Sequence, residues 1–409
     1  MGFRTVVGGL FSGWLRPYVQ GGFNWRDILI DITSPEYLMS NLNKLFKILK
    51  LKLWVIIGDE ISSQKRLAIF YAGHELGKNC LAKLAFGDYY RENYIGKKWF
   101  WEIPKVVGKG SHDCSLIVTE APDSFRKSFE EIKCLYVPFW IYGEIDLTVD
   151  NSSLFDRKNS SLRSDLSKIR KNILLFEVRN ELALLHDFYY NMHIPYVTGA
   201  HGNRSEIVSY SFVKREFRKG GELLFIKKGN EYIAGILLIY RKDRAILHII
   251  GIKDGNLNYV EEGCIGALVY FSFAYLTEKD FKKIDFGGSR PFLKDGVLQY
   301  KKKWNQKICR VSKTGYFIKP LLKTDGVKGF FLNNPFIYEE QMSFKGAIFV
   351  ESDQSLSKKD FKKICQDFYI NGLSKLVIYR FGEADNKTWS IIPPKFSDRI
   401  TINSAESIF

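Results

Sequence analysis

Three apolar segments that follow one another closely constrain the fold of this chain more than any other feature. They cover residues 222–227, 232–240 and 245–251. The turns between them, Gly229-Asn230 and Lys242-Asp243, have the length and residue types of hairpin connections. The sequence therefore predicts three antiparallel strands in a meander.

The segments after the meander predict that the same sheet gains parallel order. A long apolar helix is expected at about 259–277, then a buried strand at 283–286, a helix near 297–304 and a last strand at 308–317. Strands that alternate with helices in this way pair in parallel across the crossover. The expected fold class is α+β, with a mixed antiparallel and parallel sheet flanked by helices.

Helical spacing dominates the segment before the meander. Ser164 is expected to cap a first helix that carries Leu166, Ile169 and Ile173 on its apolar face. A second helix is expected to open at Asn180 and to stop before Pro195, because proline disfavours helical geometry in the residue before it. A third helix is expected from about 205 to 220.

A chain of 409 residues is too long for one ordinary core and predicts two or three domains. Residues 1–150 alternate apolar runs with helical stretches, which indicates an N-terminal mixed α/β domain. The polar stretch 150–163 is the expected linker, and residues 160–325 form the expected second domain. Residues 330–409 carry a strand, a helix and a strand at 346–351, 358–370 and 375–379, which predicts a small β-α-β extension. The elements expected in the first domain lie at 28–32, 42–49, 51–57, 114–119 and 135–142.

Composition restricts the partners and the compartment. The formal charge of +16 would attract polyanions such as RNA or an anionic membrane surface, although a solvated basic surface explains it equally well. The six cysteines form no CxxC pair and have no histidine at zinc-ligand spacing, so neither a disulfide framework nor a metal site is expected. No targeting signal is legible at the N-terminus, and the most apolar run, 51–58, is too short to span a bilayer. We expect a cytoplasmic protein of undetermined oligomeric state, with peripheral membrane contact left open.

Four segments resemble the Fem-like branch of the GNAT acyltransferase superfamily. They are SDLSKIRKN at 164–172, FYYNMHIPY at 188–196, GNEYIAGILLI at 229–239 and, most specifically, DFGGSRPFLKDGVLQYKKKW at 285–304. The resemblance covers roughly residues 160–320. It implies a GNAT-like fold that transfers an acyl or aminoacyl group to an amine. The donor would be an acyl-CoA or an aminoacyl-tRNA, and the acceptor a small-molecule or peptide amine.

The last of these segments holds the predicted donor-binding site. A strand that ends in Gly287 and Gly288 lets its backbone approach a ligand, because glycine permits close contact and a positive φ. Positive charge nearby would attract an anionic donor, and a guanidinium can fork onto a phosphate. The expected donor-binding residues are Gly287, Gly288, Ser289, Arg290, Lys301, Lys303, Arg170 and Lys171. The expected catalytic residues are Asp285, Tyr196 and His201. Asp285 could hold the amine, and Tyr196 and His201 would lie near the acceptor.

Structural interpretations of the same residues stay open. The glycine pair could form only a tight turn, and Asp285 could cap that turn. Lys301, Lys302 and Lys303 spread around a helix, so at most one or two can face a site. Tyr300 and Trp304 fit core packing, His201 fits a surface loop, and His186 and His193 fit ordinary core or surface positions.

The expected helix start near residue 260 departs from the pattern that GNAT enzymes use to hold the pyrophosphate of coenzyme A. The glycines of VEEGCIGA at 260–267 fall at the wrong interval for that pattern, and Glu261 and Glu262 occupy the first turn. These carboxylates suit the helix dipole but would repel a pyrophosphate. The departure favours a tRNA-borne or otherwise differently bound donor over coenzyme A.

The expected chemistry is direct attack of the amine on a thioester or ester carbonyl. The sequence shows no recognisable Ser-His-Asp or Cys-His arrangement that would supply a nucleophile and its base. The alternative is a non-catalytic adaptor of the same fold that binds RNA or an anionic membrane surface.

Overall fold

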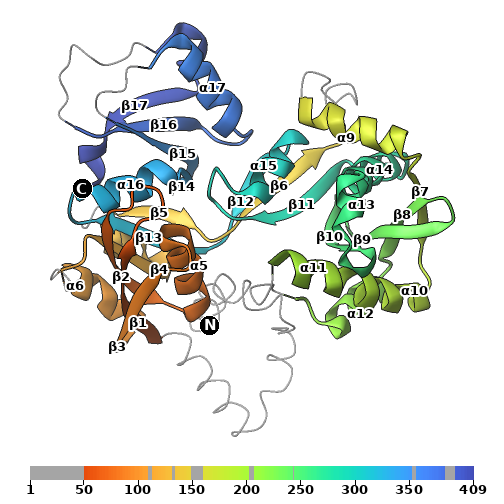
Figure 1. The fold of residues 1–409 in the computed structure, drawn as a ribbon, viewed down its shortest axis with the longest axis horizontal. Coiled ribbons are helices and arrows are strands. Elements are labelled where there is room, and N and C mark those ends of the chain that lie inside the picture. The colour runs from red at the N-terminus through yellow and green to blue at the C-terminus, as the bar shows by residue number, and fades with distance from the viewer. Residues whose placement is uncertain are drawn as a thin grey trace, which may run out of the picture.

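The strands form three sheets in a computed structural model that describes residues 50–409 apart from 109–112, 131–133, 149–159, 202–206, 243, 352–355 and 383–391. A six-stranded sheet has the order β3-β1-β2-β4-β13-β5, a seven-stranded sheet the order β12-β6-β11-β10-β9-β8-β7, and a four-stranded sheet the order β14-β15-β16-β17. The seven-stranded sheet and its helices form one half of the molecule, and the other two sheets form the second half (Figure 1). The predicted α+β class with a mixed sheet is confirmed. The expected elements at 28–32 and 42–49 lie outside the described residues.

The six-stranded sheet pairs strands from both ends of the chain. Its strands are β1 (Lys50–Asp59), β2 (Arg66–Gly73), β3 (Tyr90–Trp99), β4 (Leu116–Pro122), β5 (Leu135–Pro138) and β13 (Thr314–Pro320). The helices beside it are α5 (Glu75–Phe86), α6 (Ile103–Gly108), α7 (Arg126–Glu130) and α16 (Asp325–Asn333), with short 3-10 turns at Phe100–Glu102 and Asp123–Phe125. Alternate residues of β1, β2 and β4 enter two separate core clusters, one on each face of the sheet. Both faces are therefore covered.

Two glycines fix α5 against this sheet. The carboxylate of Glu120 on β4 accepts hydrogen bonds from the backbone N–H of His74 at 2.9 Å and from the hydroxyl of Tyr71. A Cβ on Gly77 would lie 1.8 Å from Glu120 Oε1, and one on Gly73 would lie 2.6 Å from the same side chain. Only glycine at both positions lets the start of α5 approach the buried carboxylate this closely.

The seven-stranded sheet contains the predicted meander. Its strands are β6 (Ile141–Asp146), β7 (Leu175–Arg179), β8 (Glu222–Lys228), β9 (Glu231–Arg241), β10 (Arg244–Ile252), β11 (Lys283–Ser289) and β12 (Lys307–Val311). The pairs β8–β9 and β9–β10 are antiparallel, and β11 joins β10 in parallel, as the sequence predicts. Its helices are α9 (Ser160–Lys171), α10 (Leu182–Asp187), α11 (Ile194–His201), α12 (Tyr210–Arg218), α13 (Leu257–Glu261), α14 (Cys264–Glu278) and α15 (Gly296–Lys303), with a π turn at Phe188–His193 and a 3-10 turn at Lys253–Gly255. One core cluster packs α9 and α14 on one face, and another packs α10, the π turn and α12 on the opposite face.

The four-stranded sheet contains the predicted β-α-β unit. It consists of β14 (Phe336–Glu340), β15 (Ser343–Val350), β16 (Lys375–Arg380) and β17 (Ile400–Ser404), with α17 (Lys358–Phe368) and 3-10 turns at Pro394–Phe396 and Ala405–Ile408. The strands β15 and β16 pair in parallel on either side of α17 in sequence, which confirms the prediction. The helix begins with a capping box between Ser357 and Asp360. The outer strands β14 and β17 were not predicted.

Two expected strands are each split between two sheets. The segment 135–142 forms β5 in the six-stranded sheet and β6 in the seven-stranded sheet. The segment 308–317 likewise forms β12 and β13, again in different sheets. Within the described residues, the chain therefore crosses between the two halves at about 139–140 and again at about 312–313. Local periodicity identifies a strand but not the sheet that accepts it.

Three of the helix predictions were wrong. The helix expected to stop before Pro195 continues through it, since α10, the π turn and α11 follow one another without a break and Ile194 has helical φ and ψ. The helix expected at 259–277 is broken at Gly263, which has a φ of +100° and separates α13 from α14. Ser164 lies inside α9 and does not cap it.

Candidate functional site

The parallel strands β10 and β11 pair over only three residues and then separate. Residues 244–246 pair with 283–285, and no further register follows. Both strands are irregular at this level, since β10 shifts register against β9 between Leu247 and Ile249, and β11 shifts register against β6 between Asp285 and Gly288. We call residues 247–249 and 286–288 the splay. Some of its backbone groups bond to side chains and not to a neighbouring strand, since the Gly287 N–H donates to Asp285 and the Gly288 carbonyl accepts from Lys301.

Gly287 forms the bend of β11 at the splay. Its φ is +73°, a conformation that strongly favours glycine, and its N–H donates to Asp285 Oδ1 at 2.9 Å. A Cβ at this position would lie 3.7 Å from Lys301 Nζ and 4.0 Å from the carbonyl oxygen of Leu247 on β10. Asp285 therefore caps the bend, and the glycine lies between β10 and a lysine of α15.

Lys301 is the cation that the fold places at the splay. The helix α15 begins at the N-cap Asp295, whose carboxylate accepts the N–H of Leu298 at 2.9 Å. The ammonium of Lys301 donates to the carbonyl of Gly288 at 2.8 Å and lies 5.6 Å from the ring of Phe286. Burial lowers the pKa of Lys301 to about 8, and the neighbouring Asp285 and Asp295 oppose this shift. The group therefore loses its proton far more readily than an ordinary lysine.

Arg290 lies beside the other glycine and contacts the opposite half of the molecule. Its guanidinium is 4.1 Å from the centre of the Trp140 ring, and its Nη2 is 3.8 Å from Cys80 Sγ on α5. A Cβ on Gly288 would be 3.3 Å from Trp140, so this glycine makes room for the ring. No carboxylate of the described residues forms an ion pair with Arg290. The structure thus gives Arg290 a bridging role between the two halves, while Lys301 contacts the splay directly.

Ser289 is buried behind these residues. It is 2% exposed, and its hydroxyl forms no hydrogen bond within the part of the chain that the structure describes.

The other predicted cations do not meet at Gly287. Lys303 forms a 2.5 Å ion pair with Asp165 on α9, and its ammonium is 4.0 Å from the centre of the Tyr300 ring. Arg170 and Lys171 are exposed in the last turn of α9. These contacts make Lys303 a link between α15 and α9. The partner Asp165 was missed, because the two residues are 138 positions apart and no local pattern connects them.

The predicted acceptor residues lie on α11. Tyr196 packs against the core cluster that contains α14, and burial raises the pKa of its hydroxyl, with Cys264 adding to the shift. His201 is the last residue of α11, and its side chain lies outside the described part of the structure.

The N-terminus of α14 is covered by side chains of α9. A Cβ on Gly266 would lie 2.9 Å from Cβ of Asp165, and one on Gly263 would lie 2.8 Å from Cβ of Lys168. Glu262 forms a 2.7 Å ion pair with Lys228 and so faces β8. Because Asp165 places a carboxylate against this turn, the helix dipole is already matched by a negative charge from within the chain.

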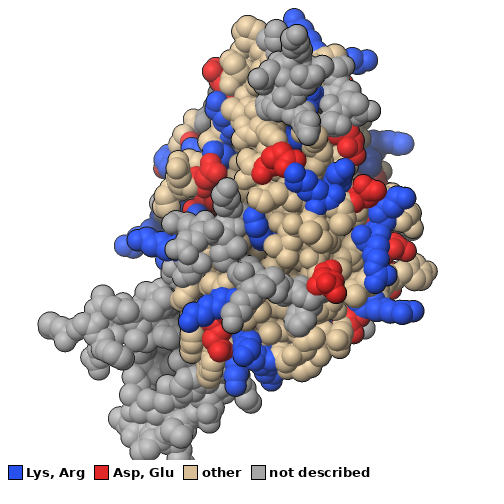
Figure 2. Space-filling model, turned by 90° about the vertical axis from the view of Figure 1, so that its left-hand side faces the viewer, with Lys and Arg blue, Asp and Glu red and all other residues tan. Residues whose placement is uncertain are grey.

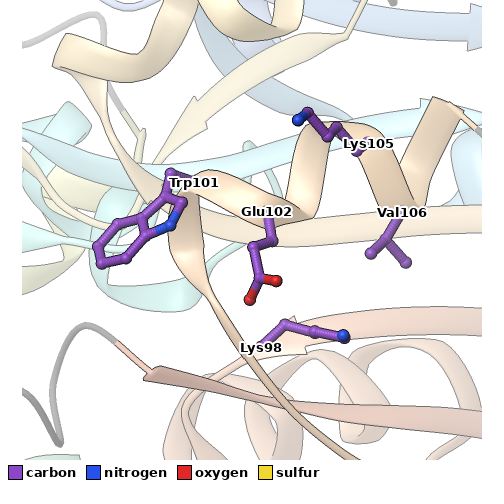
Figure 3. A pocket seen from close by; sticks show the side chains of 5 residues that line it. All are labelled: Lys98, Trp101, Glu102, Lys105 and Val106. Carbon is purple, nitrogen blue, oxygen red and sulfur yellow. The ribbon is translucent and has the colours of Figure 1, made fainter.

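A separate hollow lies at the end of β3. It has a volume of about 280 Å³ and is lined by Lys98, Trp101, Glu102, Lys105 and Val106 (Figure 3). The rings of Trp99 and Trp101 stack 4.9 Å apart, and Glu102 accepts the N–H of Trp99 at 2.8 Å. None of the predicted site residues lines this hollow.

Charge is mixed on the face shown in Figure 2. Lysine and arginine side chains are interspersed there with acidic ones around a central area of other residues, so the excess of positive charge does not form one continuous patch in that view. Within the described ranges, no helix is both long and apolar enough to cross a membrane, and no group of three or more potential metal ligands occurs.

Comparisons with known proteins give structural neighbours only. No family model and no curated protein matches the chain. Solved structures similar to it include the C-terminal domain of a protein described as a lysylphosphatidylglycerol synthetase from Agrobacterium fabrum, at 12% identity over 74% of this chain and 91% of that one, with a TM-score of 0.34. A FemX structure matches at 12% identity over 65% and 84%, with a TM-score of 0.34, and L-PGS from Bacillus licheniformis at 11% over 73% and 95%, with a TM-score of 0.35. One of these neighbours, FemX, bears the name of the Fem group that the four sequence segments resemble.

Proposed function

We propose that this protein is an N-acyltransferase that carries an acyl or aminoacyl group from an activated donor to an amine at the splay. One observation carries the proposal. A lysine with a pKa lowered to about 8 lies against a glycine bend at the point where two parallel strands separate. Strongly perturbed groups of this kind concentrate at functional sites, and unpaired backbone at a strand separation can hold a carbonyl group.

Lys301 would stabilise the oxyanion that forms from the donor carbonyl and would help to protonate the leaving oxygen. The amine nitrogen attacks the carbonyl carbon of the donor ester, and the carbonyl oxygen becomes an oxyanion. An ammonium has three N–H donors, of which the Gly288 carbonyl takes one, so Lys301 can also donate to the oxyanion. When the tetrahedral intermediate collapses, the C–O bond to the leaving group breaks, and the proton lost by the amine ends on the leaving oxygen. A pKa near 8 lets Lys301 pass that proton at neutral pH.

The surroundings of α14 favour a tRNA-borne donor over coenzyme A. A pyrophosphate at the helix N-terminus would meet the Asp165 carboxylate beside Gly266. Asp165 is ion-paired with Lys303, so its side chain opposes a pyrophosphate there mainly by filling the space beside Gly266. An aminoacyl ester needs no pyrophosphate at that point. Lys301 and the splay can serve it without any rearrangement of α9.

The alternative is a binding protein without turnover. The hollow beside the stacked Trp99 and Trp101, with Lys98 and Lys105 in its wall, supports this alternative, because aromatic rings and lysines together suit single-stranded RNA. Such a protein would bind RNA in a salt-dependent manner whether or not Lys301 is present.

Two methionine variants test the proposal. The purified protein is incubated with a mixture of aminoacyl-tRNAs or with acyl-CoA, each with a pool of amines, and amide products are measured. Lys301→Met should reduce transfer by at least a hundredfold, in line with the loss of one oxyanion donor. Lys302→Met is the matched control, since the Lys302 ammonium points to the carbonyl of Gln366 on α17. Product formation by neither the wild type nor the control, or by all three proteins equally, would reject the proposal.

A further inference from the structure

Two histidines beside β10 have no part in the mechanism above. His248 belongs to the splay, and His193 contacts the backbone of Ile250, two residues further along the strand. His248 follows Leu247, whose carbonyl oxygen faces Gly287. His193 is the last residue of the π turn and is 5% exposed. From the sequence, His193 has an ordinary core or surface position, and no pattern singles out His248.

A bulge turns His248 toward the helices. The register between β10 and β9 skips His248, which is therefore the extra residue of the irregularity. A bulge re-aims the side chain at that position. The ring of His248 lies 5.8 Å from the ring of Phe212 on α12, and the next residue, Ile249, packs in the cluster formed with α10 and α12. The imidazole thus lies on the face covered by α10, the π turn and α12.

The π turn brings His193 to the same face. A Cβ on Gly251 would lie 2.7 Å from the backbone nitrogen of His193, so only glycine in β10 allows the turn to rest on the strand. The Nδ1 atom of His193 is 2.7 Å from the carbonyl oxygen of Ile250. Because a carbonyl can only accept, Nδ1 carries the proton and Nε2 is left with a lone pair. A π turn within a longer helix is often found at a functional site.

Both Nε2 atoms are buried without a hydrogen-bond partner among the described residues. Burial lowers the pKa of His193, and it lowers that of His248 to about 4. Of the charged groups around His248, Glu216 opposes the shift, whereas His193 and Arg241 add to it. Both rings are therefore neutral at pH 7. A buried acceptor without a donor is unfavourable in the free protein and is satisfied when a ligand supplies an N–H.

We infer that His193 and His248 form the acceptor subsite, in which two neutral imidazoles each accept one N–H of a primary amine. The inference rests on the proposed function, since it names the acceptor of that same site. A neutral primary amine has two N–H groups and one lone pair. With both N–H groups held, the lone pair remains for attack on the donor carbonyl at the splay.

The charge around the pair narrows the class of amine. The surroundings that keep both imidazoles neutral also disfavour an ammonium, and the nearby Glu216 is already paired with Lys219 and Arg241. The amine must therefore bind without its proton. At pH 7 about a tenth of an α-amino group is neutral, but less than a thousandth of a lysine side chain is. The acceptor is a primary amine of low pKa, such as an α-amino group.

Binding of the amine can be measured without any donor. Protein labelled with ¹⁵N-histidine is titrated with glycinamide, and the imidazole resonances are assigned with His248→Gln and His193→Gln. The Nε2 resonances of both histidines should shift with glycinamide but not with N,N-dimethylglycinamide, which has no amine N–H when neutral. Absence of any shift, or equal shifts with both compounds, would overturn the inference. If His193→Gln does not fold, His193→Asn is used to assign that signal instead.

A kinetic measurement separates this inference from the proposed function. His248→Gln should raise the KM for glycinamide at least tenfold, whereas the control variant Lys302→Met should keep the wild-type KM. If Lys301→Met loses transfer but His248→Gln keeps the wild-type KM, the acceptor subsite is wrong and the function stands. If no donor is used by the wild type but both resonances still shift with glycinamide, the function is wrong and the amine site stands.

Discussion

Replacing Lys301 with methionine should make the protein more stable as well as less active. Burial lowers the pKa of Lys301 from its usual 10.5 to about 8. At about 1.4 kcal/mol for each tenfold change in proton affinity, keeping the group charged at neutral pH costs about 3 kcal/mol. Methionine removes this cost, but it also removes the hydrogen bond to the Gly288 carbonyl, worth about 1 kcal/mol. Because solvent reaches part of the side chain, we expect a net gain of about 1–2 kcal/mol.

The stability gained by Lys301→Met should decrease as the pH rises. Between pH values of about 8 and 10.5 the lysine is protonated in the unfolded chain and largely neutral in the folded one. The unfolded state then binds more protons, so the wild type becomes more stable as the pH rises through this window. The methionine variant has no proton to lose at this position. Its advantage is therefore full below pH about 8 and disappears above pH about 10.5.

Urea unfolding followed by tryptophan fluorescence at about pH 7 and about pH 10 measures both quantities. Lys302→Met is again the matched control, since burial lowers the pKa of Lys302 to about 8 as well. It should gain stability with the same pH dependence and keep its transfer activity. A Lys301→Met protein that is less stable than the wild type at pH 7, or whose gain is the same at both pH values, would refute the reasoning.

Three further predictions concern the bend, the bridge between the halves and the acid limit. Gly287→Ala should lose about 1–2 kcal/mol of stability from its φ of +73°, whereas Gly296→Ala, where no atom lies within 4 Å, should be neutral in the same urea experiment. Arg290→Ala should lose about 1–2 kcal/mol of folding stability, because the contact with Trp140 is removed. If unfolding is unchanged but transfer falls tenfold, Arg290 binds the donor instead. Burial alone would raise the pKa of Glu216, but hydrogen bonds from Lys219 and Arg241 lower it to about 2. About 3 kcal/mol of folding stability should therefore be lost as the pH falls from about 4.5 to 2. Glu216→Gln should lack this acid-dependent loss when unfolding is measured across that range.

The parts of the fold that depend on local spacing could be predicted from the sequence. The meander at 222–251 has two-residue turns, so its pairing follows from the turns themselves. The β-α-β unit around α17 was also predicted from local spacing, because a strand, a helix and a strand follow one another closely in the sequence. In both cases the information lies within about thirty residues of chain.

The parts that depend on distant partners could not be predicted. The residue spacing of α15 shows only that three consecutive lysines diverge, and the structure sends Lys301 to Gly288, Lys302 to α17 and Lys303 to α9. Which lysine serves the site depends on the position of β11 and α9, and not on α15 itself. The pairing of β13 with β4 could not be predicted from local sequence either, because nearly two hundred residues separate the two strands.

The site is the place where several features that are unfavourable for folding occur close together. A bulge in β10, a bulge and a positive φ in β11, and a half-buried lysine all meet within contact distance of Gly287. Each of these features costs stability, and none strengthens the sheet, since β10 and β11 stop pairing there. A chain that only needed this fold would be more stable with an apolar residue at 301. Lys302 has the same lowered pKa, so the energetic cost alone does not explain Lys301. We propose that Lys301 differs in acting on a bound carbonyl group, and the comparison of Lys301→Met with Lys302→Met decides whether that proposal holds.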